Sequence, residues 1–511
     1  MSIAVEKPTN VRYGVLGFAC VLSMVTYLDR VCFGTVAPFV KLEFGLDDDQ
    51  VGSIFTAFTL AYAAFEVPTG WLGDVFGPRK TLIRIVLWWS LFTALTGLIY
   101  PSAMAFFFML AVRFLFGIGE AGAYPNIARA FHNWFPFQER GFAKGTVWMA
   151  GRFAGGITPF VVLAMLIETP GTDGAPAVTH WRHIFWVFGA IGVVWCIGFW
   201  FWFRDRPEES PHVNKAELAL IHAGDSHFQP AAVPLAEPPV FQADDPKLAA
   251  SISAGAPKIV PLPVPTKHER IKVPWGKLIT SPNLWLLCGM YFCASFGWYF
   301  NITYMPGYLQ TQFKAYFTTE RTVKWSAEWW EFSIMLGLPL LAGSLACIVG
   351  GYLTDLFIKK TGNRKWGRRL FGILGHGVCA VFYFLSMTTS DAWMFVICIA
   401  LASFWNDITM GAAWASCIDI GRRYSGIVSG CMNTIGNLGG AVANKSTGLI
   451  LFYYTQGIDQ KMHPDEYFQA SQPAWFINFL LFGGVYVIAA FLWMGFDATK
   501  PIEPEPGEPG A

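Results

Sequence analysis

The chain carries ionisable side chains deep inside long apolar runs, where a charged group is unfavourable. These residues are Asp29, Arg30, Glu66, Arg113, Glu120, Arg152, Asp407 and Lys445. A charge at the centre of a bilayer costs a few kcal/mol or more unless it is paired or hydrated. The set holds as many acids as bases, so a purely structural network of ion pairs is one interpretation, and a functional site is the other.

Depth along the runs favours the functional interpretation for the arginines. A helical rise of about 1.5 Å per residue puts Arg30, Arg113 and Arg152 within a few turns of the membrane centre. Guanidinium groups donate two parallel hydrogen bonds to planar oxyanions and stay charged, so three of them around a central cavity suit a carboxylate or phosphate substrate. Neighbouring carboxyl groups suit proton coupling, because their proton affinity depends on whether an arginine is engaged elsewhere. Asp29 adjoins Arg30 at about 100° on a helix, so we expect one to face the cavity and the other to reach neighbouring helices.

Motifs for other chemistries were not found in the sequence. It has no GxxxxGK[ST] loop that would cradle phosphates, so ATP-driven action is not expected. No His and Cys spacing indicates a metal site, and no nucleophile and base stand together, so we expect neither a cofactor nor an enzyme. The formal net charge of +1 provides no field that would attract nucleic acid.

The composition indicates the element that must position these charges, which is a membrane-spanning helix. Hydrophobic residues make up 54% of the chain and charged residues 14%, whereas soluble domains carry about 25% charge. About twelve apolar runs are each near the roughly 20 residues that cross a bilayer. They lie near 13–40, 51–72, 81–100, 103–131, 141–167, 183–203, 284–310, 331–354, 370–389, 392–418, 425–453 and 474–496. We predict an all-α polytopic membrane protein with 12 transmembrane helices.

The basic residues predict the orientation of the helices. The first run is too long for a signal peptide and lacks a cleavage site, so we expect it to remain as a span. Loops after even-numbered spans are rich in Lys and Arg, as at 79–84, 140–144, 359–369 and 422–423, and the other loops are poor in them. The positive-inside rule then places both termini in the cytoplasm, in a multi-pass protein of the cytoplasmic (inner) membrane. The ten cysteines lie in or at the ends of apolar runs, so no disulfide framework is expected.

The chain divides into two similar halves. We predict a six-helix bundle over 1–203, a flexible Pro- and Ala-rich cytoplasmic linker over 204–283, a second bundle over 284–496 and a disordered tail over 497–511. A weak helical pattern lies within the linker near 214–223. Glycines recur at matched places in the two halves, and such internal repeats are typical of secondary transporters with a site at the midplane. Chance glycine spacing at helix contacts is the alternative.

The segment 70–80 (GWLGDVFGPRK) resembles the cytoplasmic gating motif of the major facilitator superfamily, with Val75 where a basic residue is usual. The resemblance implies that superfamily's fold of two pseudo-repeated six-helix bundles. It also implies a gate in which Asp74 pairs with charges on a neighbouring helix to hold the outward-open state. The residues that it assigns to this gate are Gly70, Asp74 and Arg79.

Three further segments look like the anion:cation symporter family of that superfamily. They are 26–30 (TYLDR), 113–125 (RFLFGIGEAGAYP) and 417–440, which surrounds the start of the eleventh span. That family includes bacterial hexuronate, glucarate and D-galactonate/proton symporters and animal vesicular glutamate and sialic acid carriers. The resemblance implies proton coupling by Asp29 and Glu120 and anion binding by Arg30 and Arg113. The positions that it implies for contacts with a sugar acid's hydroxyls are Tyr27, Tyr62 and Asn433.

Four residues depart from the family pattern. Arg152 stands where Gln is common, and as a third cation it suits a diacid or a second anionic group. Glu66 replaces a usual Gln and suggests a further proton site or a gate. Asp407 and Lys445 are also unusual, and a simple pairing across the tenth and eleventh spans is one interpretation.

The sequence therefore predicts a monomeric secondary transporter whose partners are protons, the lipid bilayer and a small organic anion. We expect symport of a sugar acid such as an aldonate, hexuronate or aldarate by alternating access. The alternatives are a sodium-coupled or exchange carrier of phosphate or another organic anion, and a transporter-like membrane sensor. The sequence does not identify the anion.

Overall fold

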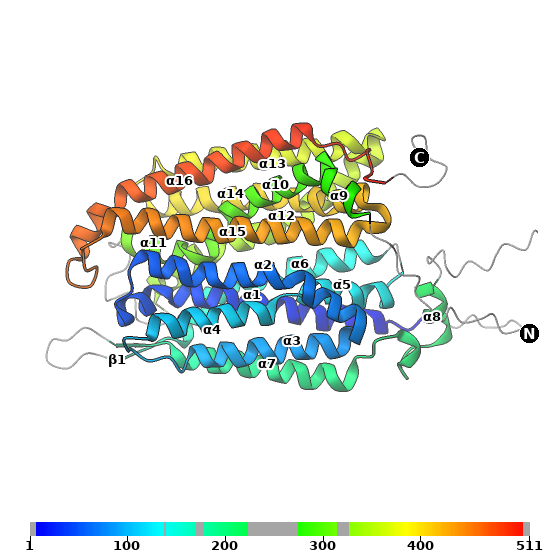
Figure 1. Ribbon diagram of the computed structural model, residues 1–511, viewed down its shortest axis with the longest axis horizontal. Helices are drawn as coiled ribbons and strands as arrows, with labels where there is room; N and C mark the ends of the chain where they lie inside the picture. The colour runs from blue at the N-terminus through cyan, green and yellow to red at the C-terminus, as the bar shows by residue number, and fades with distance from the viewer. Residues whose placement is uncertain (1–6, 137–138, 170–177, 223–273, 314–325, 504–511) are drawn as a thin grey trace, which may run out of the picture.

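The computed structural model describes residues 7–136, 139–169, 178–222, 274–313 and 326–503. Long helices run side by side along one axis of the molecule (Figure 1). The first half contains α1 (Val11–Phe44), α2 (Asp48–Phe76), α3 (Pro78–Thr96), α4 (Ala105–Glu120), α5 (Ala123–Trp134), α6 (Arg140–Met165) and α7 (Arg182–Trp202). The second half contains α10 (Pro282–Thr303), α11 (Met305–Gln312), α12 (Ala327–Thr361), α13 (Arg364–Ser386), α14 (Ala392–Gly421), α15 (Ser425–Thr455) and α16 (Pro464–Gly495).

These helices form the twelve spans that the sequence predicts, because α4 with α5 and α10 with α11 each make one span. Within the described residues, nine spans are long and apolar enough by themselves to cross a membrane. The other three spans run alongside these nine (Figure 1). They are α3 in the first half, and α10 with α11 and α15 in the second half. The sequence did not predict the short antiparallel pair β1 (Ile167–Thr169) and β2 (Val178–His180), which follows α6.

Local capping sets several helix ends. The Asp47 carboxylate accepts from the backbone N–H of Gln50, and the Asp47 backbone N–H donates to the Gln50 side-chain oxygen, which forms a capping box that starts α2. Gly45 ends α1 with a left-handed backbone, which glycine adopts without steric cost. Asp391 caps α14 by accepting from the backbone of Met394. The loops between spans can therefore be short and polar.

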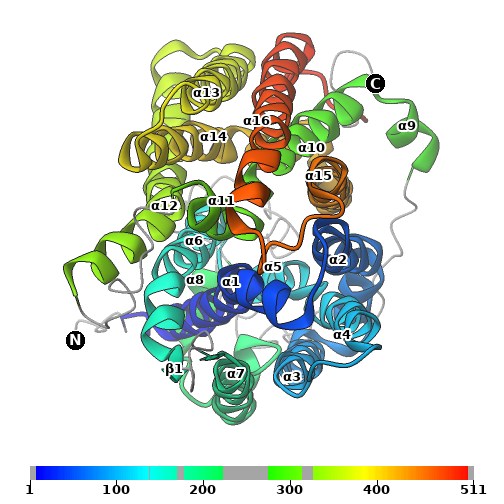
Figure 2. The ribbon, with the colours of Figure 1, turned by 90° about the vertical axis from the view of Figure 1, so that its left-hand side faces the viewer.

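Viewed along the helices, the two halves lie on opposite sides of the molecule (Figure 2). Both chain termini lie at one end of the bundle, which we call the terminal end, and β1 lies at the opposite end, which we call the far end (Figure 1). Contacts between the halves run from α1 to α10 and α11, from α2 to α15 and from α6 to α12. Since α10 and α11 form one span, the fold is two bundles that meet along three pairs of spans.

The apolar core is shared between the halves at the far end and divided at the terminal end. One cluster combines α1 residues such as Phe33 and Val36 with Phe296 and Phe300 of α10. At the terminal end, a cluster that includes Val15 and Trp195 belongs to the first half, and a separate cluster around Cys288 belongs to the second. The far end is thus the better sealed of the two.

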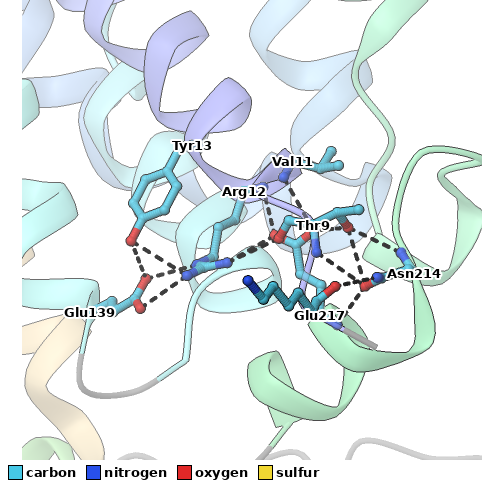
Figure 3. A network of polar contacts seen from close by, with 8 residues as sticks. Thr9, Val11, Arg12, Tyr13, Glu139, Asn214 and Glu217 are labelled. Carbon is cyan, nitrogen blue, oxygen red and sulfur yellow. Dashed lines mark hydrogen bonds and ion pairs between the residues drawn. The ribbon is translucent and has the colours of Figure 1, made fainter. Parts of the chain in front are cut away.

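Part of the predicted linker is folded onto the first half. The weak helical pattern forms α8 (Lys215–His222), whose Glu217 is fully buried. Glu217 accepts from the backbone N–H groups of Val11 and Arg12, from the Thr9 hydroxyl at 2.5 Å and from the Arg12 guanidinium at 3.1 Å (Figure 3). The positive N-terminal end of the α1 dipole also stabilises a carboxylate at this position. The stretch 204–222 is therefore structured, as is α9 (Trp275–Thr280), while residues 223–273 lie outside the described chain.

The start of the predicted disordered tail is also folded. Asp497 lies 2.8 Å from the Lys365 ammonium, and the backbone N–H of Ile502 donates to the Ile420 carbonyl. Burial raises the pKa of the Asp497 carboxyl, but hydrogen bonds from Lys365 and Thr499 outweigh it and lower the pKa to about 2. Residues 504–511 lie outside the described chain.

Candidate functional site

A cavity of about 40 Å³ lies between the two halves in the middle of the bundle. The N-terminal half lines it with Tyr27 and Arg30 of α1, Tyr62 of α2, Tyr124 of α5, and Trp148 and Arg152 of α6. The second half contributes Tyr291, Ala294, Ser295, Trp298 and Tyr299 of α10, Met410 of α14, and Asn433 and Asn437 of α15. This volume accommodates a few water molecules, so a larger substrate requires the halves to move apart.

A break in the fourth span shapes one wall of the cavity. The sequence predicts a single helix over 103–131, but α4 ends at Glu120 and α5 begins at Ala123. Gly122 between them has φ of +86°, and a Cβ there would lie 2.2 Å from the Thr69 hydroxyl oxygen. The prediction of one continuous helix was wrong here, because close contact with α2 imposes a backbone that only glycine adopts easily. Tyr124 then stacks on Trp148, with ring centroids 4.4 Å apart.

Arg30 lines the cavity and is paired within its own half. Its Nε donates to Glu120 Oε1 at 2.6 Å, and Glu120 is fully buried. The guanidinium carbon also lies 4.6 Å from the ring centroid of Tyr62. Nη2 of Arg30 has no hydrogen-bond partner in the described residues, so this cation retains a free donor.

Asp29 and Arg113 are buried, but neither lines the cavity. The Arg113 guanidinium carbon lies 4.3 Å from the Phe33 ring centroid and 4.4 Å from that of Phe116. Neither oxygen of Asp29 has a hydrogen-bond partner among the described residues, and Arg113 is a cation within its electrostatic reach. Two of the three expected arginines therefore reach the cavity, and Asp29 and Arg30 point apart as their adjacency on the helix predicts.

Arg152, the second cavity arginine, is paired with the opposite half. Its Nη1 lies 2.9 Å from Asp407 Oδ2, and both side chains are buried. Lys445 lies 2.5 Å from Asp49 Oδ1 and donates to the Ser53 hydroxyl, both on α2. The interpretation that Asp407 pairs with Lys445 is wrong, because each faces a different helix of the first half. Both ion pairs join the two halves of the molecule.

Glu66 and Asn433 meet between the halves beside the cavity. The Asn433 amide donates to Glu66 Oε1, and Glu66 is almost completely buried. On the same side, Tyr299 donates its hydroxyl hydrogen to Asn437 at 3.0 Å, and Asn437 donates to the Asn433 carbonyl. A chain of neutral and acidic groups therefore connects α2 to α10 through α15.

Several lining residues were missed by sequence reasoning. Tyr291, Ser295 and Tyr299 lie at positions i, i+4 and i+8, which share one face of α10. This spacing is a signal of a common face, but apolar packing in a membrane helix shows the same period. Tyr304, at the end of α10, lies outside the cavity lining and donates to the Asn444 carbonyl nearer the far end.

The predicted gate motif forms the turn from α2 to α3 at the terminal end. A Cβ at Gly70 would lie 3.2 Å from Pro125 Cβ, so α2 and α5 approach closely there. The backbone N–H of Arg79 donates to Asp205 at 2.8 Å, and its guanidinium donates to the Trp200 carbonyl. Asp74 lies on α2, but its side chain is outside the described atoms, so its pairing stays a prediction.

Two similar six-helix bundles around a buried, charged midplane cavity are the architecture of secondary transporters. The sequence profile of the Major Facilitator Superfamily matches residues 19–444. The chain belongs to the Major Facilitator Superfamily, and it is therefore a membrane transporter rather than an enzyme.

Curated relatives cover most of the chain. It is 30% identical over 448 residues to the probable sulfoacetate transporter SauU of Cupriavidus necator. The aligned region covers 87% of this chain and 89% of the relative. It is 27% identical to the probable galactarate/D-glucarate transporter GudP of Escherichia coli, over 88% of this chain and 89% of the relative. These relatives agree with the resemblance to the anion:cation symporter family.

Solved structures support the fold alone. A bacterial homologue of the human lysosomal transporter Spinster matches with a TM-score of 0.65 and 18% identity, over 95% of this chain and 98% of the other. The xylose transporter XylE from E. coli matches with a TM-score of 0.59 and 10% identity, over 96% and 98% of the two chains. The predicted all-α fold of two six-helix bundles is confirmed.

Proposed function

We propose that this protein is a monomeric proton-coupled symporter of an organic anion, in particular a sugar acid such as an aldonate, hexuronate or aldarate. The observation that carries the proposal is the pair of cavity arginines, Arg30 and Arg152, each held by a buried carboxylate. Guanidinium groups bind carboxylates through paired hydrogen bonds and keep their charge. The two relatives described above are named as transporters of sulfoacetate and of galactarate/D-glucarate, which are organic anions.

The polar groups around the arginines suit a hydroxylated substrate. Tyr27, Tyr62 and Asn433 supply hydroxyl and amide groups to the cavity wall. Tyr124 and Tyr299 add two further hydroxyls. A sugar acid presents one anionic end and several hydroxyls, so it satisfies these donors and acceptors better than a bare phosphate does.

Exchange of partners couples protons to the anion. Glu120 holds Arg30 at 2.6 Å when it is ionised, and protonation of Glu120 releases Arg30 to a substrate carboxylate. Asp29 is a second acceptor, because an ionised carboxyl with no hydrogen-bond partner is costly in this interior and a bound proton removes the charge. Arg113 lies within reach of both carboxyls and stabilises whichever is ionised. Glu66 is a third candidate, since its bond to Asn433 crosses between the halves.

The basic residues at the terminal end indicate how the protein is oriented in the membrane. Basic residues in the predicted cytoplasmic loops lie where α2 meets α3 and where α12 meets α13, as Arg79, Lys359 and Arg364 do. These junctions are on the side of the termini (Figure 1). The positive-inside rule makes this end cytoplasmic, in the inner membrane. The sealed far end then faces outward, and the cavity opens next toward the cytoplasm when the divided cores at the terminal end separate. Gly70, Asp74 and Arg79 lie at this cytoplasmic gate.

Uptake into proteoliposomes tests the proposal. D-galactonate and galactarate are supplied outside vesicles with an imposed inward proton gradient, with a sodium gradient at constant pH as the comparison. We expect the proton gradient to drive accumulation, the sodium gradient to have no effect, and Arg30→Gln to abolish uptake. Where net charge moves inward, a potential adds about 2.3 kcal/mol per 100 mV for each charge. Uptake that is independent of both the pH gradient and the membrane potential, or that requires sodium, would overturn the proposal of proton symport.

A further inference from the structure

The ion pair between Arg152 and Asp407 joins the two halves in the cavity wall. Arg152 is 3% exposed and Asp407 is 1% exposed, and Nη1 lies 2.9 Å from Oδ2. The Asn406 amide donates to the other carboxylate oxygen at 2.9 Å. Nε and Nη1 of Arg152 and Oδ2 of Asp407 make no hydrogen bond in the described residues, so the contact is an ion pair and the guanidinium has donors to spare.

The surroundings are shaped to hold this pair. A Cβ on Gly343 of α12 would lie 2.2 Å from Asp407 Oδ2, so a side chain there would displace the carboxylate. The Arg152 guanidinium carbon lies 4.7 Å from the ring centroid of Trp298, which also lines the cavity. Tyr27 interacts electrostatically with both Arg152 and Arg30, so its side chain lies near both cations.

Arg152 is the one cation that acts on Asp407 within the described chain. The other titratable groups that interact electrostatically with Asp407 are Tyr27, Tyr291, Cys347, Cys379, Tyr383 and Tyr486. Tyrosine and cysteine are neutral near pH 7 at their ordinary pKa values. When another anion binds Arg152, no second cation among the described residues can therefore pair with the Asp407 carboxylate.

We propose that Arg152 and Asp407 form a subsite for the second anionic group of a dianionic substrate, which replaces the Asp407 carboxylate on Arg152. Asp407 then takes up a proton from solution, because a buried carboxylate without its partner is strongly destabilising. The first anionic group binds Arg30. A dianion consequently crosses with one proton more than a monoanion, and the net charge moved is the same for both. This proposal rests on the proposed function and specifies its substrate class.

Galactarate and D-galactonate form a matched pair of probes, since they differ at one end in a carboxylate against a hydroxymethyl group. In proteoliposomes, reversal potentials measured at several pH gradients give the protons carried with each probe. We expect one more proton with galactarate in the wild type. In Asp407→Asn we expect galactarate to lose that proton, while the proton count for D-galactonate stays the same. Asp391→Asn is the control on the same helix, since Asn also caps α14.

Arg152→Gln should reduce galactarate uptake about tenfold or more relative to D-galactonate, because charged hydrogen bonds to one end of the substrate are lost. The double variant Arg152→Gln with Asp407→Asn removes both charges and guards against a misfolded single variant. It should show the same ratio of D-galactonate to galactarate uptake as Arg152→Gln. Equal losses for both probes, or an unchanged proton count in Asp407→Asn, would overturn the subsite. Neither result would affect proton-driven uptake by the wild type, whose absence would instead reject the proposed function.

Discussion

Arg30 and Arg152 line one cavity but are held by carboxylates of different halves. Glu120 belongs to the same half as Arg30, so that pair persists when the halves move as rigid bodies. Asp407 belongs to the half opposite Arg152, so that pair must adjust when they separate. The two arginines therefore have the same chemistry, but only the ion pair of Arg152 changes when the halves move apart.

At this scale we predict that Glu120→Gln destabilises the protein and that a bound anion restores its stability. Removing one member of a buried ion pair costs roughly 3–5 kcal/mol, since Arg30 is left with an uncompensated charge. A substrate carboxylate on Arg30 supplies the missing charge, so galactarate should raise the unfolding temperature more in the variant than in the wild type. The measurement is thermal unfolding followed by labelling of the buried cysteines, such as Cys288 and Cys379.

Glu43→Gln is the matched control, because its partner Arg182 lies 2.7 Å away in a partly exposed pair. Such pairs contribute at most about 1 kcal/mol, and this one is remote from the cavity. An anion-dependent rise that is equal in Glu120→Gln and the wild type would contradict the assignment of Arg30 to the anion.

At the scale of helices, α8 anchors the start of α1, the helix that carries Asp29 and Arg30. Glu217 connects α8 to the first turn of α1, and Arg12 extends the network to Glu139, which precedes α6 (Figure 3). The residues before α8 are thus part of the first bundle. The position of α1 depends on a segment that sequence reasoning assigned to a flexible linker.

We predict that Glu217→Ala loosens the start of α1 and lowers the free energy of unfolding by about 3 kcal/mol or more, since the Arg12 charge loses a buried partner. Hydrogen exchange should become faster at the amides of Val11 and Arg12, which donate to Glu217. The control is Glu208→Ala, which removes an exposed carboxylate 2.8 Å from His222 on the same segment. Unchanged exchange at these two amides would show that α8 does not hold α1.

At the scale of the whole molecule, the two halves are in close contact at the far end. A Cβ on Gly52 of α2 would lie 2.9 Å from the Asn444 carbonyl oxygen, and one on Gly34 of α1 would lie 1.9 Å from the Ile302 carbonyl oxygen. Asp48 accepts from the Tyr467 hydroxyl at 2.8 Å and from Thr455 at 3.0 Å, so polar contacts add to this seal. The structure describes one of the two states that alternating access requires.

We predict that Gly52→Leu prevents closure of the far end, since the larger side chain cannot fit between α2 and α15. Net uptake should fall by about tenfold or more, while binding of the anion to the open state is kept. Gly17→Leu is the control, because no atom lies within 4 Å of a Cβ at that position. Adding Ser53→Cys provides the readout: a membrane-impermeant maleimide should label it faster in Gly52→Leu than in Gly17→Leu. Equal labelling and normal uptake would contradict a tight seal at Gly52.

The twelve spans, their division into two halves and the identity of the buried charges were all predictable from the sequence. A bilayer demands long apolar helices with satisfied backbone groups, so composition and periodicity along the chain are sufficient to find them. The orientation of Asp29 against Arg30 was predictable for a similar reason, because adjacent helical positions always diverge.

Only the tertiary structure decided which charge meets which. Asp407 pairs with Arg152 rather than Lys445, and Arg113 is buried against Phe33 rather than in the cavity. Such partners depend on the rotation of each helix and on the side chains of other helices, which are far away in the sequence. The break at Gly122 and the burial of Glu217 have the same origin, since both are imposed by segments that approach only after the bundle has assembled.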